Sequence, residues 1–257
     1  RRTVSSGSFL LPILSDTESK TIQNMSVVIN SRMVSFAVHA LAIIVSVMVF
    51  VWSINYRGGF AWDSTNKALI FNIHPVLTLI GLVILGGEAI ISYKSLPLEQ
   101  RVKKLIHLVL HAIAIILGIC GIVAAFRHHN KIHVPHLYTI HSWIGIGVIV
   151  LYGLQWLFSF IVYFYPRGSS SLRSNFLPWH VLLGIFVYAL AVGTSVLGFL
   201  EKLTFLEKSG LDKLGSEAFL VNFMAIFTVL FGTVVLHIVS SKSPASSNED
   251  NYSYSAI

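Results

Sequence analysis

The sequence predicts an all-α membrane protein with six transmembrane helices. Of its 257 residues, 54% are hydrophobic and only 11% are charged, whereas a soluble domain has about 25% charged residues. The mean hydropathy is +0.75. Six apolar runs are each long enough to cross roughly 30 Å of hydrocarbon. The connections between them are short and leave no room for a sizeable soluble domain.

These runs define the expected helices in order. They cover residues 33–54, 69–92, 105–126, 138–165, 177–200 and 218–239, and together they make up one membrane domain, residues 33–239. Residues 1–32 are polar and lack the basic-then-apolar order of a signal peptide, so we expect a flexible cytosolic tail there. Residues 240–257 are rich in Ser, which predicts a disordered cytosolic tail.

The distribution of Lys and Arg predicts the orientation. With a cytosolic N-terminus, one side of the membrane carries 11 of these residues and the other carries 7, which favours both termini in the cytosol. The net charge of +7 comes from residues scattered over loops at span ends, so we expect no nucleic-acid binding. The single cysteine, Cys120, lies in the third span and excludes an intrachain disulfide and a multi-cysteine metal site.

Four of the eleven histidines occupy the same place within their predicted spans. His74, His107, His141 and His180 each stand a few residues inside the start of spans two to five. Because successive helices alternate in direction, His74 and His141 lie near the non-cytosolic face, whereas His107 and His180 lie near the cytosolic face. Ionisable side chains inside a membrane are costly and indicate a functional site. Depth therefore sorts the four into two pairs.

Two facing imidazoles can fill both axial positions of a haem iron, an arrangement that suits electron transfer. Gly145, Gly184 and Gly81 follow one or two turns after three of the histidines, and small residues there would let a flat ring approach. The inset of each ligand from its helix end predicts about 20 Å between the two irons. The same histidines would also suit the proton relay of a transporter without haem, so the pattern alone leaves both readings open.

Six short motifs carry a resemblance to a known family. They are Tyr56-Arg-Gly-Gly59, Phe71-Asn-Ile-His-Pro-Val76, Glu88 followed by Tyr93-Lys-Ser95, Lys103-Lys-Leu-Ile-His107, Leu137-Tyr-Thr-Ile-His-Ser-Trp-Ile-Gly145 and Pro178-Trp-His180. With these motifs, about residues 33–239 resemble the cytochrome b561 family, six-helix proteins that move electrons from cytosolic ascorbate across membranes. The chain looks most like the plant branch.

The resemblance implies a four-helix core, spans two to five, that holds two b-type haems. The implied axial pairs are His74 with His141 and His107 with His180. The implied activity is that of an oxidoreductase: ascorbate gives up one electron in the cytosol, and monodehydroascorbate or a ferric chelate accepts it beyond the membrane. The resemblance also leads us to expect a vacuolar or related endomembrane, and it makes a homodimer plausible.

The cytosolic entrance should offer cations to an anionic donor. Lys103 and Lys104 lie one turn from His107, and Arg173 lies in the connection before His180. The ordinary basic collar of a cytosolic helix end would explain each of these residues equally well. The resemblance singles out Lys104 as the ascorbate contact, with Lys103 and Arg173 as further candidates.

On the opposite side, the resemblance places His129 and Tyr138 at the exit site for electrons. The loop of residues 127–136 contains four histidines, which would also suit a transition metal. The resemblance assigns no role to His128, His133 or His136. A third reading, a membrane anchor for a larger redox complex, is less favoured because the chain has entry and exit sites of its own.

Overall fold

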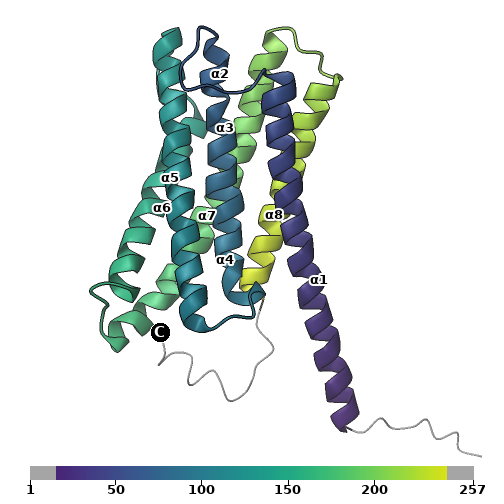
Figure 1. Ribbon diagram of the computed structural model, residues 1–257, viewed down its shortest axis with the longest axis vertical. Helices are drawn as coiled ribbons and strands as arrows, with labels where there is room; N and C mark the ends of the chain where they lie inside the picture. The colour runs from purple at the N-terminus through teal and green to yellow at the C-terminus, as the bar shows by residue number, and fades with distance from the viewer. Residues whose placement is uncertain (1–15, 242–257) are drawn as a thin grey trace, which may run out of the picture.

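The computed structural model describes residues 16–241, and all regular structure in that range is helical. In chain order the elements are α1 (Asp16–Val51), η1 (Trp52–Tyr56), α2 (Lys67–Phe71), α3 (Ile73–Thr78), η2 (Leu79–Leu85), α4 (Gly86–Ser95), α5 (Gln100–Ile132), α6 (Ile140–Tyr163), α7 (Ser170–Lys208) and α8 (Ser216–Ser240), where η marks π-helical turns (Figure 1). Six segments are long and apolar enough to cross a membrane, which confirms the predicted number of spans.

Several helices extend beyond their apolar runs. α1 begins at Asp16, so residues 16–32 are helical where we expected a flexible tail. α5 and α7 continue to Ile132 and Lys208. An apolar run marks only the part of a helix that lies in hydrocarbon, and it does not show where the helix ends. Residues 1–15 and 242–257, the remainder of the two expected tails, lie outside the described residues.

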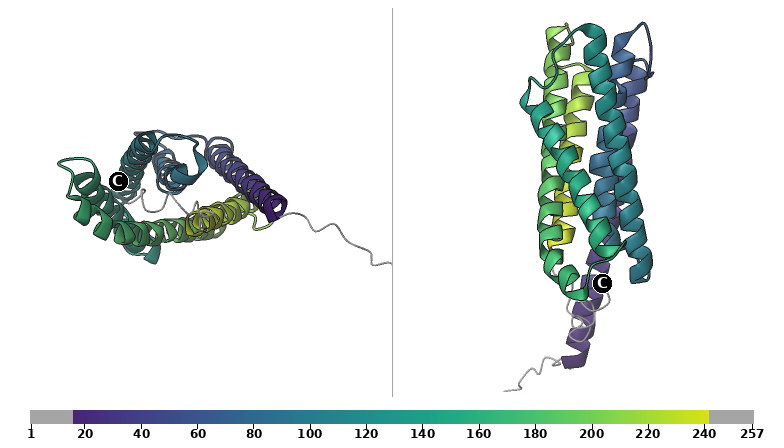
Figure 2. Two further views of the ribbon diagram at one scale, coloured as in Figure 1. Left: turned by 90° about the horizontal axis from the view of Figure 1, so that it is seen from below. Right: turned by 90° about the vertical axis from the view of Figure 1, so that its left-hand side faces the viewer.

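The six spans form a closed ring, seen end-on in Figure 2. Going round the ring, α1 packs on α8, α8 on α7, α7 on α6, and α6 on α5. α5 packs on the rod formed by α2, α3, η2 and α4, and this rod in turn contacts α1. The four candidate ligands all lie on the part of the ring made by this rod and α5 to α7.

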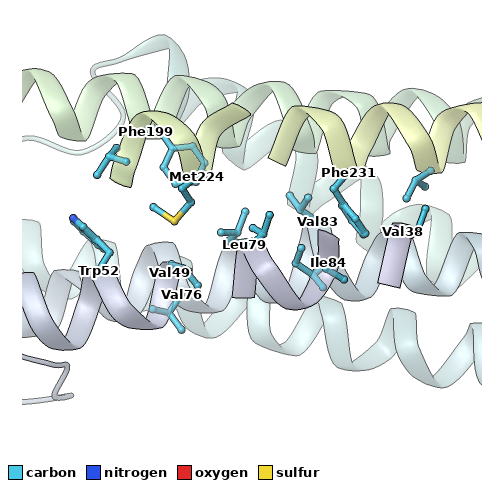
Figure 3. Close-up of a cluster of buried hydrophobic side chains, with 14 of the residues drawn as sticks. Val38, Val49, Trp52, Val76, Leu79, Val83, Ile84, Phe199, Met224 and Phe231 are labelled. Atoms are coloured by element: carbon cyan, nitrogen blue, oxygen red, sulfur yellow. The ribbon is translucent and has the colours of Figure 1, made fainter. Parts of the chain in front are cut away.

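The larger apolar cluster lies between α1, the α2–α4 rod, α7 and α8 (Figure 3). Trp52, Tyr188 and Phe231 are its largest fully buried side chains. Since lipid tails are as apolar as these side chains, close van der Waals packing is what holds the helices together here.

A smaller apolar cluster fills the middle of the histidine-bearing part of the ring. It consists of Leu82, Ala114, Val148, Tyr152, Val187 and Ala191. Ala114 stands seven residues after His107 on α5, and Val187 stands seven residues after His180 on α7. At about 1.5 Å per residue, this cluster lies about 10 Å from the inner histidines, near mid-depth.

Two prolines lie beside the histidines, and one of them coincides with a break in a helix. Pro75 follows His74 and has no N–H to bond to the carbonyl four residues earlier, on Phe71. The rod breaks here into α2 and α3 at Asn72, whose side chain donates to the carbonyls of Arg57 (3.2 Å) and Gly59 (2.7 Å). Pro178 stands inside α7, two residues before His180.

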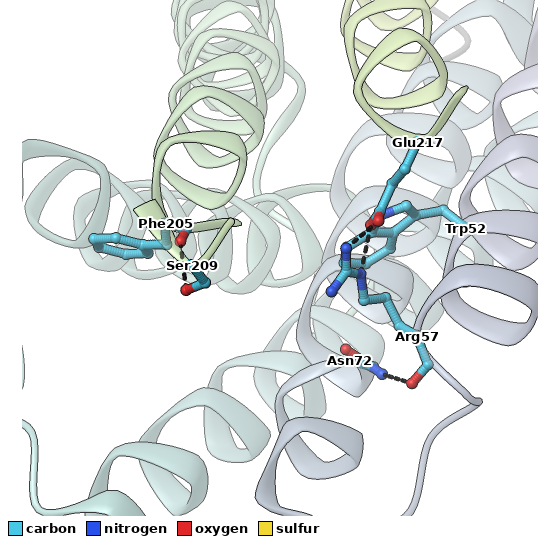
Figure 4. A network of polar contacts seen from close by, with 6 residues as sticks. All are labelled: Trp52, Arg57, Asn72, Phe205, Ser209 and Glu217. Carbon is cyan, nitrogen blue, oxygen red and sulfur yellow. Dashed lines mark hydrogen bonds and ion pairs between the residues drawn. The ribbon is translucent and has the colours of Figure 1, made fainter. Parts of the chain in front are cut away.

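A buried ion pair ties the start of α8 to the end of the first span (Figure 4). The guanidinium of Arg57 bonds to both carboxylate oxygens of Glu217, and Trp52 donates its indole N–H to Oε1 of Glu217 at 2.9 Å. Glu217 is buried. This network explains why an arginine follows the first span at residue 57.

Replacing Glu217 should destabilise the outer end of the bundle. Glu217→Ala leaves the Arg57 guanidinium without its carboxylate and the Trp52 indole without its acceptor, and breaking a buried pair in this way costs about 3–5 kcal/mol. We expect a clearly lower thermal midpoint for the purified protein in detergent. Glu99→Ala, at an exposed site before α5, is the control, and equal midpoints for the two variants would contradict this role.

Candidate functional site

The structure brings the four histidines together in two facing pairs. The rings of His74 on α3 and His141 on α6 have centres 6.0 Å apart and planes at 88°. The rings of His107 on α5 and His180 on α7 have centres 6.1 Å apart and planes at 69°. These are the two pairs predicted from depth.

Each of the four rings has its Nδ1 atom engaged by the protein. The Nδ1 of His74 lies 3.1 Å from the carbonyl oxygen of Gly121, that of His107 lies 2.9 Å from Ala89, and that of His141 lies 2.9 Å from Thr194. Because carbonyls only accept, these three Nδ1 atoms carry the proton and leave Nε2 free as a metal ligand.

His180 is held by side chains instead. Its Nδ1 lies 2.9 Å from the hydroxyl oxygen of Ser159 and 3.4 Å from the amide nitrogen of Gln155, which also donates to the His180 carbonyl at 2.7 Å. The Ser159 hydroxyl is able to accept from Nδ1 or to donate to it, and in the tautomer with the proton on Nδ1 it accepts and Nε2 is left unprotonated for a metal.

The two pairs stand at opposite ends of the bundle. Gly121, which accepts from His74, lies fourteen residues after His107 on α5. Thr194, which accepts from His141, lies fourteen residues after His180 on α7. Fourteen residues of α-helix rise about 21 Å. Two separate helices therefore give the same spacing between the outer and inner pairs, close to the 20 Å predicted.

The outer pair lines a cavity of about 410 Å³. Its wall includes Gly145, and a Cβ atom built there would have its nearest neighbour at 3.6 Å, the Cγ2 atom of Thr194. This agrees with the space expected beside His141. Gly81 behaves differently, because its Cβ would lie 2.9 Å from the backbone oxygen of Ala114. Gly81 serves the close packing of η2 on α5, so the expected role beside a ligand is wrong for this glycine.

The two predicted exit residues meet at this cavity. His129 and Tyr138 both line it, with ring centres 6.3 Å apart. His136 also lines it and stacks on His129 at 5.5 Å, and His128 packs on Phe71 at 5.3 Å. Among the side chains of residues 33–241, no three or more His, Cys, Asp or Glu converge as a metal site.

The loop after the first span is attached to the outer end of α5. Lys131 and Arg127 each place a side-chain nitrogen 3.5 Å from the carboxylate of Asp63. These two cations, Lys131 more than Arg127, hold the pKa of Asp63 below its usual value. The carboxylate therefore stays charged to a lower pH in the folded protein.

Cationic side chains gather beside the inner pair. The ammonium of Lys104 lies over the rings of Tyr163 (5.6 Å) and Phe164 (5.3 Å), and it is close enough to Arg167 and Arg173 for their charges to interact. The Nε atom of Arg173 is buried and has no hydrogen-bond partner among the described residues. Such a group of positive charges is suited to binding an anion.

Lys103 is directed elsewhere at the same end. Its ammonium donates to the backbone oxygen of Tyr93 at 3.2 Å. The Tyr93 ring lies edge-on to His107 with centres 5.2 Å apart. Lys103 is therefore near the inner pair but is not part of the group around Lys104.

Comparisons with known proteins give the family. The sequence profile described as "Eukaryotic cytochrome b561" matches residues 73–206, which contain both histidine pairs. Transmembrane ascorbate ferrireductase 1 of Arabidopsis thaliana is 66% identical over 239 residues, which cover 91% of this chain and 100% of that protein. The chain belongs to the eukaryotic cytochrome b561 family.

Other members of the cytochrome b561 family are similar over most of their length. The probable ascorbate-specific transmembrane electron transporter 1 of Oryza sativa subsp. japonica is 57% identical, with 82% of this chain and 90% of that protein covered. The transmembrane ascorbate-dependent reductase CYB561 of Sus scrofa is 40% identical, with 78% and 79% covered. The likeness thus extends from plants to mammals.

Cytochromes of this family bind haem, and the residues of this chain fit the group. Two imidazoles that share one iron, each bonded at roughly 2 Å, have ring centres about 6 Å apart, and both pairs show this separation. The protonated Nδ1 atoms of His74, His107 and His141 leave Nε2 free, as bis-imidazole ligation requires.

Two histidines of the b561 bundle lie outside the pairs but have partners. His111 is joined to the hydroxyl of Tyr152 at 2.6 Å, and its ring lies 4.3 Å from that of His107. His39 on α1 lies 2.9 Å from the carboxylate of Glu88 on α4. Both histidines are thus hydrogen-bonded or ion-paired inside the bundle.

Glu201 and Lys202 also line the outer cavity, although nothing in the sequence predicted them as site residues. They follow the last apolar residue of the fifth predicted span, on the part of α7 that extends past the apolar run. The only feature of the sequence that could have indicated a site here is an acidic residue next to a basic one, at the same end of the bundle as His141. That signal is weak, because charged residues are common at span ends.

Proposed function

We propose that this chain is a transmembrane oxidoreductase that passes electrons from cytosolic ascorbate through two b-type haems to an acceptor on the other side. The outer haem is held by His74 and His141 and the inner haem by His107 and His180. The acceptor is monodehydroascorbate or a ferric chelate. The names of its relatives, among them an ascorbate ferrireductase and an ascorbate-specific electron transporter, support this activity.

One observation carries the proposal. Two histidine pairs with the geometry of axial ligands stand about 21 Å apart along rigid helices, one at each end of a single bundle. When bound, the haem irons supply one-electron chemistry, cycling between the ferric and ferrous states. The protein fixes the ligands through their Nδ1 atoms, and the apolar cluster around Tyr152 excludes water from the middle of the bundle.

At the inner end, Lys104 with Arg167 and Arg173 supplies the cations that bind the ascorbate anion. The Lys104 ammonium rests on two aromatic rings, which hold it beside His180, since the Tyr163 ring also lies 5.8 Å from the His180 ring. The partnerless Nε of Arg173 is a further donor for such an anion. Lys103, which donates to a backbone carbonyl, has a supporting part.

Lys104→Gln should weaken ascorbate binding without abolishing electron transfer. Loss of one charge-assisted hydrogen bond should raise KM for ascorbate about tenfold, with kcat nearly unchanged. Lys104→Arg should keep much of the affinity. The matched control is Arg101→Gln, an exposed cation at the same end. An equal effect of Arg101→Gln would show that only the general basic collar matters.

At the outer end, His129 and Tyr138 bind and orient the acceptor. Both side chains line the cavity that His74 and His141 also line. An aromatic ring and an imidazole can stack on, or donate to, an acceptor that is either a planar radical or an anionic chelate.

The bias of Lys and Arg toward one side supports cytosolic termini. A vacuolar or related endomembrane and a homodimer rest on the family resemblance. Imaging of a fluorescent fusion and cross-linking in native membranes test these two points.

A visible spectrum tests the function as a whole. The purified protein should contain two haems per chain, seen as pyridine haemochromogen of the b type, and ascorbate should reduce them. Protein without bound haem, or haem that ascorbate cannot reduce, would contradict the proposal.

A further inference from the structure

Lys202 places an ammonium group in the outer cavity. Its side chain lines the cavity together with His74 and His141. Its Nζ atom lies 4.3 Å from the centre of the Phe71 ring, and the Phe71 ring lies 5.8 Å from the His74 ring. One aromatic ring therefore separates this positive charge from an outer axial ligand.

No carboxylate of the described residues forms an ion pair with Lys202. Glu217 is occupied by Arg57 and Trp52. Glu201, the adjacent residue, has its Oε2 atom 3.4 Å from the hydroxyl of Thr139 at the start of α6. Glu217 is therefore paired elsewhere, whereas Glu201 lines the same cavity, contacts a neutral hydroxyl and forms no ion pair with Lys202.

An ammonium group that lines a cavity attracts a negative charge when the protein supplies no ion-pair partner for it. The cation–π contact with Phe71 compensates only part of the positive charge. The carbonyls that would usually accept from a lysine at a helix end are not within hydrogen-bond distance of Nζ in the described part of the chain. The Lys202 ammonium, with only the Phe71 ring among the described side chains in contact with it, therefore suits a ligand that brings a negative charge.

We propose that Lys202 is the anion-binding residue of the outer cavity. This inference deepens the proposed function and rests on it: it assigns to the exit site a preference for anionic ligands, carboxylates or enolates and anionic metal chelates. The anion that Lys202 binds belongs either to an external acceptor or to a propionate group of the outer haem. The experiments below distinguish these two sources.

The first measurement needs no electron transfer. Hexacyanocobaltate is an anionic chelate that the protein cannot reduce, and its binding to the full-length protein in nanodiscs is measured by equilibrium dialysis. We expect Lys202→Gln to weaken binding at the outer site about tenfold, as the loss of one charge-assisted contact predicts. Lys202→Arg should retain the affinity.

Lys208→Gln is the matched control. Lys208 is an exposed lysine near the same end of α7, and it does not line the cavity. Its substitution removes the same charge from the same end of the helix. Binding of hexacyanocobaltate by this variant should equal that of the wild type.

The second measurement separates the two sources of the anion. If the ligand is the acceptor, Lys202→Gln raises KM for ferricyanide about tenfold and leaves KM for the hexaammineruthenium(III) cation unchanged or lower. If the ligand is a propionate, the variant lowers the reduction potential of the outer haem alone. Its KM values for the anionic and the cationic acceptor then change by the same factor.

The proposal is overturned if Lys202→Gln matches Lys208→Gln in hexacyanocobaltate affinity, in acceptor preference and in the outer haem potential. Failure of the proposed function would look different. The wild type would then lack haem or ascorbate reduction, while the difference in hexacyanocobaltate binding between Lys202→Gln and Lys208→Gln would still decide the role of Lys202.

Discussion

His107→Ala should remove the inner haem and leave the outer haem in place. The substitution deletes one of two axial ligands, while His74 and His141 stand about 21 Å away along the helices and share no ligand with it. Haem content, measured as pyridine haemochromogen, should fall from two to one per chain. Electron transfer from ascorbate to an outer acceptor should be lost. His180→Ala should behave in the same way.

The control is His237→Ala, which removes an exposed histidine on α8. It should keep both haems. The haem that remains in His107→Ala should be lost when His74→Ala is added. If His107→Ala loses only the outer haem, or loses both while the chain stays folded, the pairing proposed for the ligands is wrong.

Gly198→Ala should disturb the outer haem through the position of His141. A Cβ atom on residue 198 would lie 2.8 Å from Cε1 and 3.2 Å from Nδ1 of the His141 ring. The ring is also held by its hydrogen bond to Thr194 and cannot move without losing that contact. We expect lower occupancy or a shifted electron paramagnetic resonance signal for the outer haem only, and transmembrane electron transfer slower by on the order of tenfold or more.

Gly193→Ala is the matched control on the same helix. A Cβ atom at residue 193 would have nothing within 4 Å. Alanine favours a helix over glycine by roughly 1 kcal/mol, so this variant should be as stable as the wild type or more so, with an unchanged outer signal. If Gly198→Ala gives the same spectra as Gly193→Ala, the close contact of residue 198 with His141 does not influence the outer haem.

The number of spans and the pairing of the histidines could be predicted because both depend on one-dimensional properties. An apolar run of a given length fixes a span, and the place of a histidine within that run fixes its depth. Equal depth was therefore enough to predict that His74 lies opposite His141 and that His107 lies opposite His180.

What could not be predicted depends on how each helix is rotated and how far it continues. Lys202 looked like an ordinary lysine beyond a span, and only the rotation of α7 directs it into the cavity. Gly81 and Gly145 look alike in a sequence, but one touches a neighbouring helix and the other faces the cavity. The helical residues 16–32 are polar, and hydropathy contains no signal for a helix outside lipid.

The fourteen-residue interval on both α5 and α7 has a consequence for how such a protein can vary. Each of these helices carries one inner ligand and, fourteen residues later, the carbonyl that orients an outer ligand. The distance that an electron must tunnel is therefore set by helical rise within single rigid segments, and no loop enters into it. Substitutions or insertions in the loops at either face can change the donor or acceptor that is accepted while the tunnelling distance, and with it the intrinsic rate through the interior, stays fixed.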